Sequence, residues 1–396
     1  MNNIEVSVII PTYNKFPLNL FTLYSIENQN FDLSKVEVIM IDDGSTDQTK
    51  TLENHTFSFH FKLISVKQNL GRPRARNLGI KAATGNIIIF LDAEIIVQPD
   101  FLAIHYQYHQ RYPNLVVTGV MLMKKVYSVL FPEFSPTQFR DCTNLIKNHS
   151  EFQEKIAPFK QLHQVTPLIS EKDIVEENYR KLSFTAPYES YYLNTIISNY
   201  GYDLKGYRIP WQLFGTGHVS ASRKAIDQVG LFAEYPGYGW DDCEMGYRLY
   251  KNGATFLTDK YLISYHQEHP ISNVIEDQSK KNYYKFQETY KTVDQMIIGL
   301  TFLPVPYNLH QINQLLINYQ LLCGQYPNNF MLMKQMFHSM LRQIGALLNE
   351  NMRITALNRQ PLKQSEKIAL HIEKQKLRNL AIFQPFLQCF ERLENL

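Results

Sequence analysis

Apolar and polar residues follow one another along the first hundred residues in short blocks of two kinds. Residues 6–10, 36–41, 61–66 and 87–91 are short apolar runs rich in β-branched side chains, as expected of buried strands. Residues 18–28, 46–52 and 73–83 fit helices, the last of them with a proline in its first turn. Strands that alternate with helices indicate an α/β fold with a mainly parallel sheet that helices cover on both faces.

Beyond residue 124 this rhythm is lost. Residues 124–205 are polar and rich in Tyr, Lys and Glu, and we expect a helical insertion there that covers a site. Strand and helix signals return in three short segments, 219–222, 223–229 and 261–264. From residue 275 onward apolar residues recur at intervals of three or four, the spacing of amphipathic helices. These patterns predict an α/β domain over residues 1–274 and a helical domain over 275–396.

Polar clusters follow three of the predicted strands directly. They are Thr12-Tyr13-Asn14, Asp42-Asp43 and Asp92-Ala93-Glu94. In parallel α/β sheets ligands bind at the carboxyl ends of the strands, where these clusters are expected to meet. The convergence of three strands on one edge therefore predicts a binding site.

The chemistry of these clusters suits a nucleotide with a metal ion. Asp92 and Glu94 offer the carboxylate oxygens that a hard divalent cation needs when phosphates supply the other ligands, although a solvated turn is the plain alternative. Asp43 can accept from a ring N–H of uracil or from ribose, whereas a turn with a helix cap is its alternative.

Three arginines lie where a loop meets a predicted helix. Guanidinium groups and helix N-termini both suit phosphate oxygens, so Arg72, Arg74 and Arg76 are candidates for phosphate contacts. Plain surface charge is the alternative for at least one of them.

Two further groups of candidate residues follow much later in the chain. Asp241 and Asp242 open an amphipathic helix, where a carboxylate can take the proton of an attacking hydroxyl, and Trp240 offers a flat face to a sugar ring. The alternative is that these acidic side chains only stabilise the helix through its dipole. His266 and His269 are candidate metal ligands, with a structural role as the alternative.

Net charge, cysteine spacing and the length of apolar runs argue against several classes of protein. A formal net charge of +3 over 396 residues gives no argument for nucleic acid as a partner. The 4 cysteines are scattered without a C-x-x-C pair, which argues against a zinc site or a disulfide framework and fits a reducing cytoplasm. We see no signal peptide, and the longest apolar runs are shorter than the roughly 20 residues of a membrane span. Peripheral contact with a membrane stays open.

Together these residues resemble glycosyltransferase family 2, whose enzymes have the GT-A fold. The matching segments are residues 8–14 (opening strand and nucleotide loop), 42–47 (uridine-binding turn), 69–77 (further nucleotide contacts), 92–94 (the D-x-D position) and 240–242 (the W-[ED]-D motif). Residues 265–268 are similar to the segment of chondroitin-polymerase-type and related galactosyl or N-acetylgalactosaminyl transferases in which a histidine binds the metal. The resemblance covers about residues 4–270 and none of the helical tail.

The resemblance implies a role for each motif residue. Asp242 is expected to be the catalytic base, and Asp241 to contact the acceptor or donor sugar, as are Trp240 and Gly217. The residues expected to hold the nucleotide are Pro11, Tyr13, Asp43, Asn69, Arg76 and Asp92, and those expected to hold the metal are Glu94, His266 and Asp92. His266 is preferred over His269. Glu94 stands where the family has Asp, so the ion is expected to sit slightly displaced or to be held in another mode.

The expected activity is a metal-dependent, inverting transfer of a sugar from a UDP-sugar to a hydroxyl, with Mn²⁺ or Mg²⁺ as the cofactor. The acceptor is expected to be a carbohydrate, a lipid-linked molecule or a peptide, as in the synthesis of cell-surface polysaccharide or glycoconjugates. Two alternatives stay open: a nucleotidyltransferase, and a catalytically silent subunit that binds nucleotide sugars. The helical tail could form a homodimer, dock another partner or lie on a membrane surface.

Overall fold

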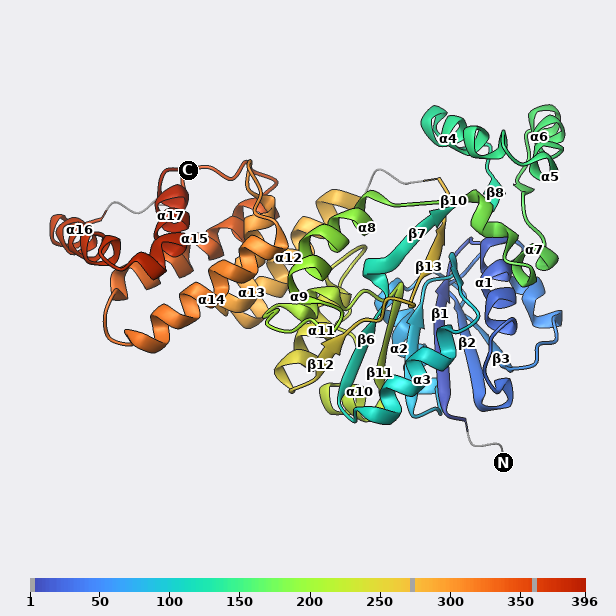
Figure 1. Ribbon diagram of the computed structural model, residues 1–396, viewed down its shortest axis with the longest axis horizontal. Helices are drawn as coiled ribbons and strands as arrows, with labels where there is room; N and C mark the ends of the chain where they lie inside the picture. The colour runs from blue at the N-terminus through green and yellow to red at the C-terminus, as the bar shows by residue number, and fades with distance from the viewer. Residues whose placement is uncertain (1–3, 271–274, 358–361) are drawn as a thin grey trace.

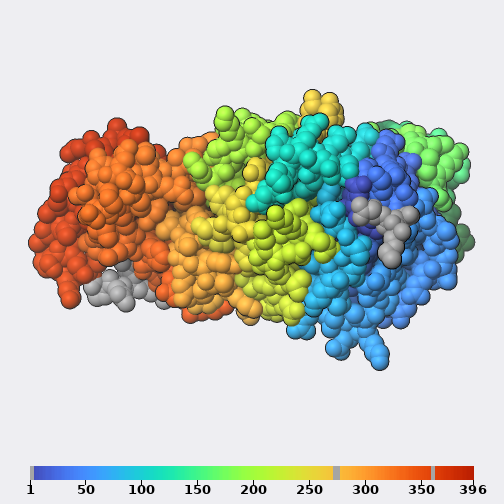
Figure 2. Space-filling model, turned by 90° about the horizontal axis from the view of Figure 1, so that it is seen from below, coloured from blue at the N-terminus to red at the C-terminus, as the bar shows by residue number. Residues whose placement is uncertain are grey.

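The computed structural model describes residues 4–270, 275–357 and 362–396, and the molecule is elongated (Figure 1). An α/β part built around a large sheet lies at one end, and the C-terminal helices lie at the other. Seen from below, the surface continues from one part to the other (Figure 2). Within the described ranges, no helix has both the length and the apolar character needed to cross a membrane.

A seven-stranded sheet forms the centre of the α/β part. In spatial order its strands are β12 (Thr255–Leu257), β6 (Leu115–Thr118), β11 (His218–Ser222), β4 (Ile87–Leu91), β1 (Val6–Thr12), β2 (Val36–Asp42) and β3 (His60–Ser65). Strand β11 runs antiparallel to both of its neighbours, and the other pairs are parallel. The predicted α/β fold with a mainly parallel sheet is confirmed.

Side chains alternate between the two faces of this sheet, as the pleat of a strand requires. Along β1, Val8 and Ile10 belong to the core that includes helix α1 (Leu18–Glu27) and helix α3 (Phe101–Arg111), whereas Ile9 belongs to the core on the other face. That other core includes helices α2 (Arg72–Ala82), α10 (Arg223–Val229) and α11 (Asp241–Lys251). Because both faces are buried, the strands read as continuous apolar runs.

A second sheet extends the edge at which the main strands end. Its strands lie in the order β10 (Ser183–Phe184), β7 (Met123–Val126), β13 (Ser264–Gln267) and β5 (Ile95–Val97). The strand predicted over residues 261–264 is placed too early, because β13 begins only at Ser264. The antiparallel pairing of β13 with β5 sets His266 opposite Ile95, directly after Glu94.

The segment predicted as a helical insertion contains helices and short strands. Its helices are α4 (Pro136–Ile146), α5 (Ser150–Gln153), α6 (Ile156–Leu162), α7 (Glu171–Val175), α8 (Pro187–Tyr192) and α9 (Ser198–Tyr200). Strands β8 (Val129–Leu130) and β9 (Thr166–Pro167) pair with each other, while β7 and β10 join the second sheet. Helices α4, α5 and α6 project from the body (Figure 1). The bounds of the insertion stay a prediction.

The C-terminal part is helical, as predicted. Its helices are α12 (Ile275–Tyr290), α13 (Val293–Met296), α14 (Leu309–Gln325), α15 (Met331–Asn349), α16 (Gln364–Arg378) and α17 (Gln384–Glu394). These helices share one core with a face of the large sheet. At the junction the ring of Phe286 lies 5.6 Å from that of Trp211 and 5.7 Å from that of Tyr247. The domain boundary at residue 275 stays a prediction.

Candidate functional site

A cavity of about 660 Å³ lies at the carboxyl ends of the central strands. Strands β1 and β2 run parallel in a register that pairs Thr12 with Asp42, so the loops that follow them start side by side. The cavity is lined from these loops, from the start of α2, from the end of β4 and from the segment before α11: Pro11, Thr12, Tyr13, Lys15, Asp43, Asn69 to Ala75, Asp92, Glu94 and Glu234 to Tyr238. Residues from the three predicted strand-end clusters therefore line one cavity, as expected.

Asp43 joins two of these loops. Its carboxylate accepts hydrogen bonds from the backbone N–H of Leu70 (2.7 Å) and of Gly71 (2.9 Å). Burial raises the pKa of Asp43, although both N–H donors act in the opposite direction. The loop beside it cannot carry a larger residue at Gly44, which has φ +82° and whose added Cβ would lie 2.9 Å from the backbone of Gln68. The carboxylate keeps free lone pairs with which to accept from a ligand.

Positive groups border the same cavity at the start of α2. The helix follows Gly71, whose φ of +92° turns the chain, and both Gly71 and Arg72 line the cavity. The guanidinium of Arg72 lies 5.0 Å from the ring centre of Tyr238. Arg74 pairs with Glu234 at 2.7 Å, and both side chains are about half exposed. A helix N-terminus with an adjacent arginine can bind the oxygens of a phosphate.

Arg76, by contrast, is buried and holds two acidic segments together. Its Nη1 lies 2.9 Å from Asp241 and its Nη2 lies 3.4 Å from Asp92, so the end of β4 is joined to the first turn of α11. The backbone N–H of Asp92 donates to the carbonyl of Gly217 at 3.3 Å. An added Cβ on Gly217 would come within 3.1 Å of the Asp92 carboxylate. The predicted contacts of Arg76 with nucleotide and of Gly217 with sugar stay predictions.

Asp242 lies in the first turn of α11 and is the candidate base. Burial, together with the charge of Asp241, raises the pKa of Asp242 to about 6. The Cys243 backbone N–H donates to its carboxylate at 2.7 Å. The indole of Trp240 packs against C-terminal rings, 4.8 Å from Tyr283 between centroids, so the stacking of a sugar on this ring stays a prediction.

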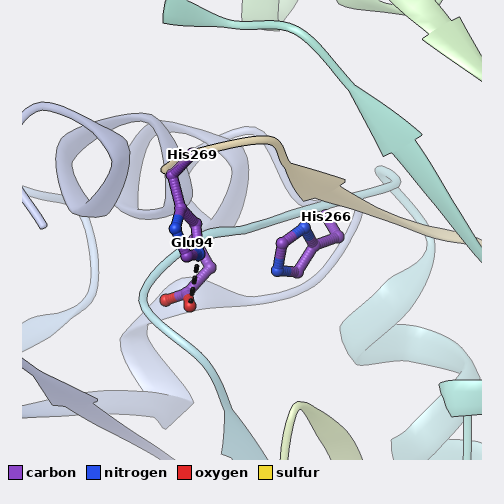
Figure 3. A group of neighbouring side chains, drawn as sticks. All are labelled: Glu94, His266 and His269. Carbon is purple, nitrogen blue, oxygen red and sulfur yellow. Dashed lines mark ion pairs between the residues drawn. The ribbon is translucent and has the colours of Figure 1, made fainter. Parts of the chain in front are cut away.

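Glu94, His266 and His269 form the candidate metal centre (Figure 3). One ligand atom from each lies within 4.8 Å of the other two, and in the described ranges no other such group is found. The cluster does not include Asp92, whose predicted metal contact stays a prediction. The sequence favours His266 over His269 as the metal ligand, yet Nε2 of His269 lies 3.3 Å from the Glu94 carboxylate.

Both imidazoles are held in an orientation that suits metal binding. Nδ1 of His269 lies 2.9 Å from the carbonyl oxygen of Pro270, which can only accept, so Nδ1 carries the proton. The Lys15 ammonium, which can only donate, lies 2.9 Å from Nε2, so Nε2 keeps its lone pair. Nδ1 of His266 lies 3.4 Å from the carboxylate of Glu268, which Lys125 holds at 3.0 Å. A carbonyl or carboxylate behind each ligating imidazole is the usual support of a metal-binding histidine.

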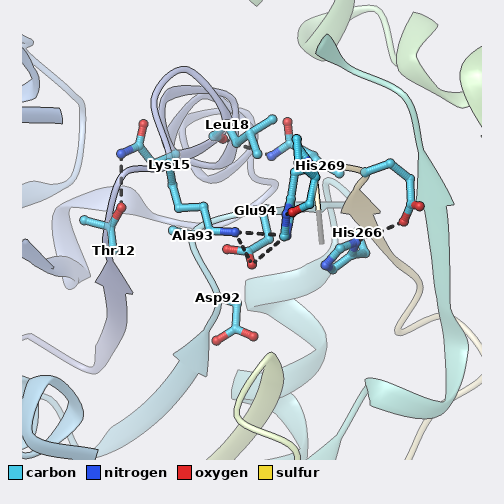
Figure 4. A network of polar contacts seen from close by, with 12 residues as sticks. Thr12, Lys15, Leu18, Asp92, Ala93, Glu94, His266 and His269 are labelled. Carbon is cyan, nitrogen blue, oxygen red and sulfur yellow. Dashed lines mark hydrogen bonds and ion pairs between the residues drawn. The ribbon is translucent and has the colours of Figure 1, made fainter. Parts of the chain in front are cut away.

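The separation of Glu94 and His269 suits two ligands of one divalent ion. Two ligands at right angles, each about 2.1 Å from an octahedral ion, are about 3 Å apart, close to the 3.3 Å between Glu94 and His269. Burial alone would raise the pKa of Glu94, but the ammonium of Lys15 acts in the opposite direction, and this pKa lies well below its ordinary value. The carboxylate is therefore ionised and ready to bind a cation. Lys15, which no sequence motif indicated, contacts both Glu94 and His269 (Figure 4).

Comparison with known proteins identifies the family to which this chain is similar. Residues 7–160 match the family described as Glycosyl transferase family 2. An uncharacterized glycosyltransferase, YfnE of Bacillus subtilis, is 32% identical over 301 residues, which are 75% of this chain and 74% of that protein. The chondroitin synthase of Escherichia coli is 24% identical over 268 residues, 67% of this chain but only 35% of that longer protein. A crystal structure of S. aureus TarS 1-349 in complex with UDP-GlcNAc aligns with a TM-score of 0.47 and 16% identity, covering 99% of this chain and 90% of that one.

Proposed function

The chain belongs to glycosyltransferase family 2, and we propose that it moves a sugar from a UDP-sugar to an acceptor hydroxyl with inversion at the anomeric carbon. One observation carries the proposal. A single cavity of about 660 Å³ runs from Asp43 and Asn69, past the start of α2, to Asp92 and Glu94. It thus joins groups suited to a base and ribose with groups suited to phosphates and a metal ion.

The choice of UDP rests on Asp43. Its carboxylate is fixed by two backbone N–H groups and retains lone pairs that can accept from the N3–H of uracil. Pro11, Tyr13 and Asn69 line the same cavity. On this basis we propose a uridine nucleotide, and the panel below compares it with guanosine and thymidine nucleotides.

The proposed chemical step is a single displacement. Asp242 takes the proton of the acceptor hydroxyl as that oxygen attacks the anomeric carbon, and UDP leaves with the electrons of the broken bond. A carboxylate with a pKa of about 6 is mostly ionised at pH 7 and is a stronger base than an ordinary aspartate. Arg76 positions it indirectly, since Arg76 ties the neighbouring Asp241 to the end of β4.

Glu94, His266 and His269 would hold Mn²⁺ or Mg²⁺. When bound, such an ion neutralises charge that develops on a departing diphosphate. The acceptor is proposed to be a hydroxyl of a carbohydrate, a lipid-linked molecule or a peptide, in a cytoplasmic pathway that builds polysaccharide or glycoconjugates. A role of the C-terminal helices in dimer formation or at a membrane surface belongs to the same proposal.

A panel of sugar nucleotides tests this function. Purified protein with Mn²⁺ is incubated with UDP-, GDP- and dTDP-sugars, with and without hydroxyl acceptors, and released nucleoside diphosphate is measured. A separate incubation contains UTP and sugar 1-phosphates, and released pyrophosphate is measured there. Release of UDP from at least one UDP-sugar is expected, with little release from the others. Release of pyrophosphate from UTP and a sugar 1-phosphate would instead identify a nucleotidyltransferase, and tight UDP binding without turnover on any acceptor would identify a silent binding subunit.

A further inference from the structure

Lys15 is not among the site residues predicted from the sequence, yet its ammonium contacts two of the three candidate metal ligands. Its Nζ lies 3.0 Å from Oε1 of Glu94 and 2.9 Å from Nε2 of His269. Those two ligand atoms are 3.3 Å apart, so one nitrogen bridges them (Figure 4). We propose that the Lys15 ammonium fills the cation position of this site until a divalent ion displaces it, and then binds the diphosphate of the donor.

The ammonium uses the atoms that a metal ion would use. Nδ1 of His269 donates to the Pro270 carbonyl, so the Nε2 lone pair is directed at Lys15, and the carboxylate of Glu94 accepts from the same ammonium. The lone pair of His269 and the carboxylate oxygen of Glu94 can bind either the ammonium or a metal ion at this position, but not both at once. Two cations at that position would also repel each other strongly in a poorly solvated site.

The site requires a cation even without metal. Glu94 is only 6% exposed, and a buried carboxylate without a partner is strongly unfavourable. Lys15 supplies that partner from a flexible four-carbon stem, which lets its charged end move. Because Lys15 also lines the cavity beside Glu94, Asp92 and the start of α2, its ammonium can turn toward a diphosphate there.

Charge balance couples the two ligands. Glu94 and Lys15 together are neutral, so a divalent ion brings two uncompensated positive charges into a partly buried site. A diphosphate supplies the negative charge and also accepts the displaced ammonium. Metal and nucleotide should therefore strengthen each other's binding by the same factor, as thermodynamic linkage requires. This coupling rests on the proposed nucleotide donor, whereas the competition between Lys15 and the metal does not.

Metal binding measured without nucleotide tests the competition directly. Free Mn²⁺ is followed by electron paramagnetic resonance during titration of the wild type, Lys15→Met and Lys15→Arg. The matched control is Lys124→Met, because Lys124 also pairs with a buried carboxylate, Glu189, at 3.1 Å but does not touch the metal centre. Circular dichroism and thermal unfolding show whether each variant is folded.

Lys15→Met should bind Mn²⁺ about tenfold more tightly than the wild type, within the usual range of coupling between sites. The Mn²⁺ affinity of Lys15→Arg, which keeps the charge, should stay within about twofold of that of the wild type, and so should the Mn²⁺ affinity of Lys124→Met. Equal or weaker Mn²⁺ binding by folded Lys15→Met would overturn the proposal, as would tighter binding by Lys124→Met to the same extent.

A second titration includes UDP. UDP should raise the Mn²⁺ affinity of the wild type about tenfold and that of Lys15→Met much less. An equal rise in both proteins would overturn the transfer of Lys15 to the diphosphate. If UDP binds to neither protein, the proposed donor is wrong, while the titration without nucleotide still decides whether Lys15 competes with the metal.

Discussion

Replacing Arg76 with methionine should destabilise the protein strongly. The substitution keeps much of the side-chain volume but removes the partner of Asp241, whose side chain is only 8% exposed and lies 2.9 Å from the guanidinium. Breaking a buried ion pair from one side costs about 3–5 kcal/mol because the remaining charge is left unpaired. The contact with Asp92, at 3.4 Å and with that carboxylate 26% exposed, adds less than about 1 kcal/mol. We therefore expect the free energy of unfolding to fall by about 3–5 kcal/mol.

Urea unfolding at 25 °C, followed by circular dichroism, measures this loss. Arg74→Met is the matched control in the same helix, because Arg74 pairs with Glu234 at 2.7 Å but both side chains are about half exposed. Its loss should stay below about 1 kcal/mol. Adding Asp241→Asn to Arg76→Met removes the unpaired charge and should give a coupling energy of about 1–3 kcal/mol. A loss for Arg76→Met no larger than that for Arg74→Met, or a coupling near zero, would refute the reasoning.

Three further predictions concern activity and metal binding. Since Asp242 must be ionised and its pKa is raised to about 6, kcat should fall as the pH drops through about 6, and Asp241→Asn should move this limb to lower pH. In Gly217→Ala the added Cβ would lie 3.1 Å from the Asp92 carboxylate, so kcat/KM for the donor should fall about tenfold while the unfolding temperature changes little. His269→Ala should weaken Mn²⁺ binding at least about tenfold by calorimetry, and removal of metal with EDTA should abolish turnover.

Each of these predictions has a contradicting outcome. An acid limb near the ordinary aspartate value of 3.8 would show that Asp242 is not the titrating base. Unchanged kcat/KM for the donor in Gly217→Ala would show that the exact position of the Asp92 carboxylate does not affect how the enzyme uses the donor. Wild-type affinity for Mn²⁺ in His269→Ala would leave His266 and Glu94 as the metal ligands, in agreement with the preference drawn from sequence alone.

The fold could be predicted because its signals are local. The runs 36–41 and 87–91 differ by no more than one residue from β2 and β4, and the polar clusters behind them line one cavity. A strand buried on both faces is a continuous apolar run, and its register places the next residues at the sheet edge. The start of β13 was missed because residues 261–264 have a strand-like composition but lie mostly before the pairing with β5.

The contacts that organise the site could not be predicted, because they join residues far apart in the chain. The sequence motif predicts that Arg76 contacts the nucleotide, and nothing near Arg76 in sequence indicates its ion pair with Asp241, which lies 165 residues later. Lys15 and His269 are separated by 254 residues. The preference for His266 over His269 came from a motif, whereas the orientation of both rings depends on partners that only the folded chain brings together. Trp240 likewise packs against rings of the C-terminal helices.

The central claim is that this cavity transfers a sugar from UDP with Asp242 as the base, and Asp242→Asn tests it most directly. UDP release from the preferred UDP-sugar is measured for the wild type and the variant at saturating donor and Mn²⁺, with UDP affinity and unfolding temperature as checks on folding. The account predicts a loss of about 10²- to 10⁴-fold in kcat, the contribution of general base catalysis, with UDP affinity retained. Undiminished turnover by folded Asp242→Asn would contradict it.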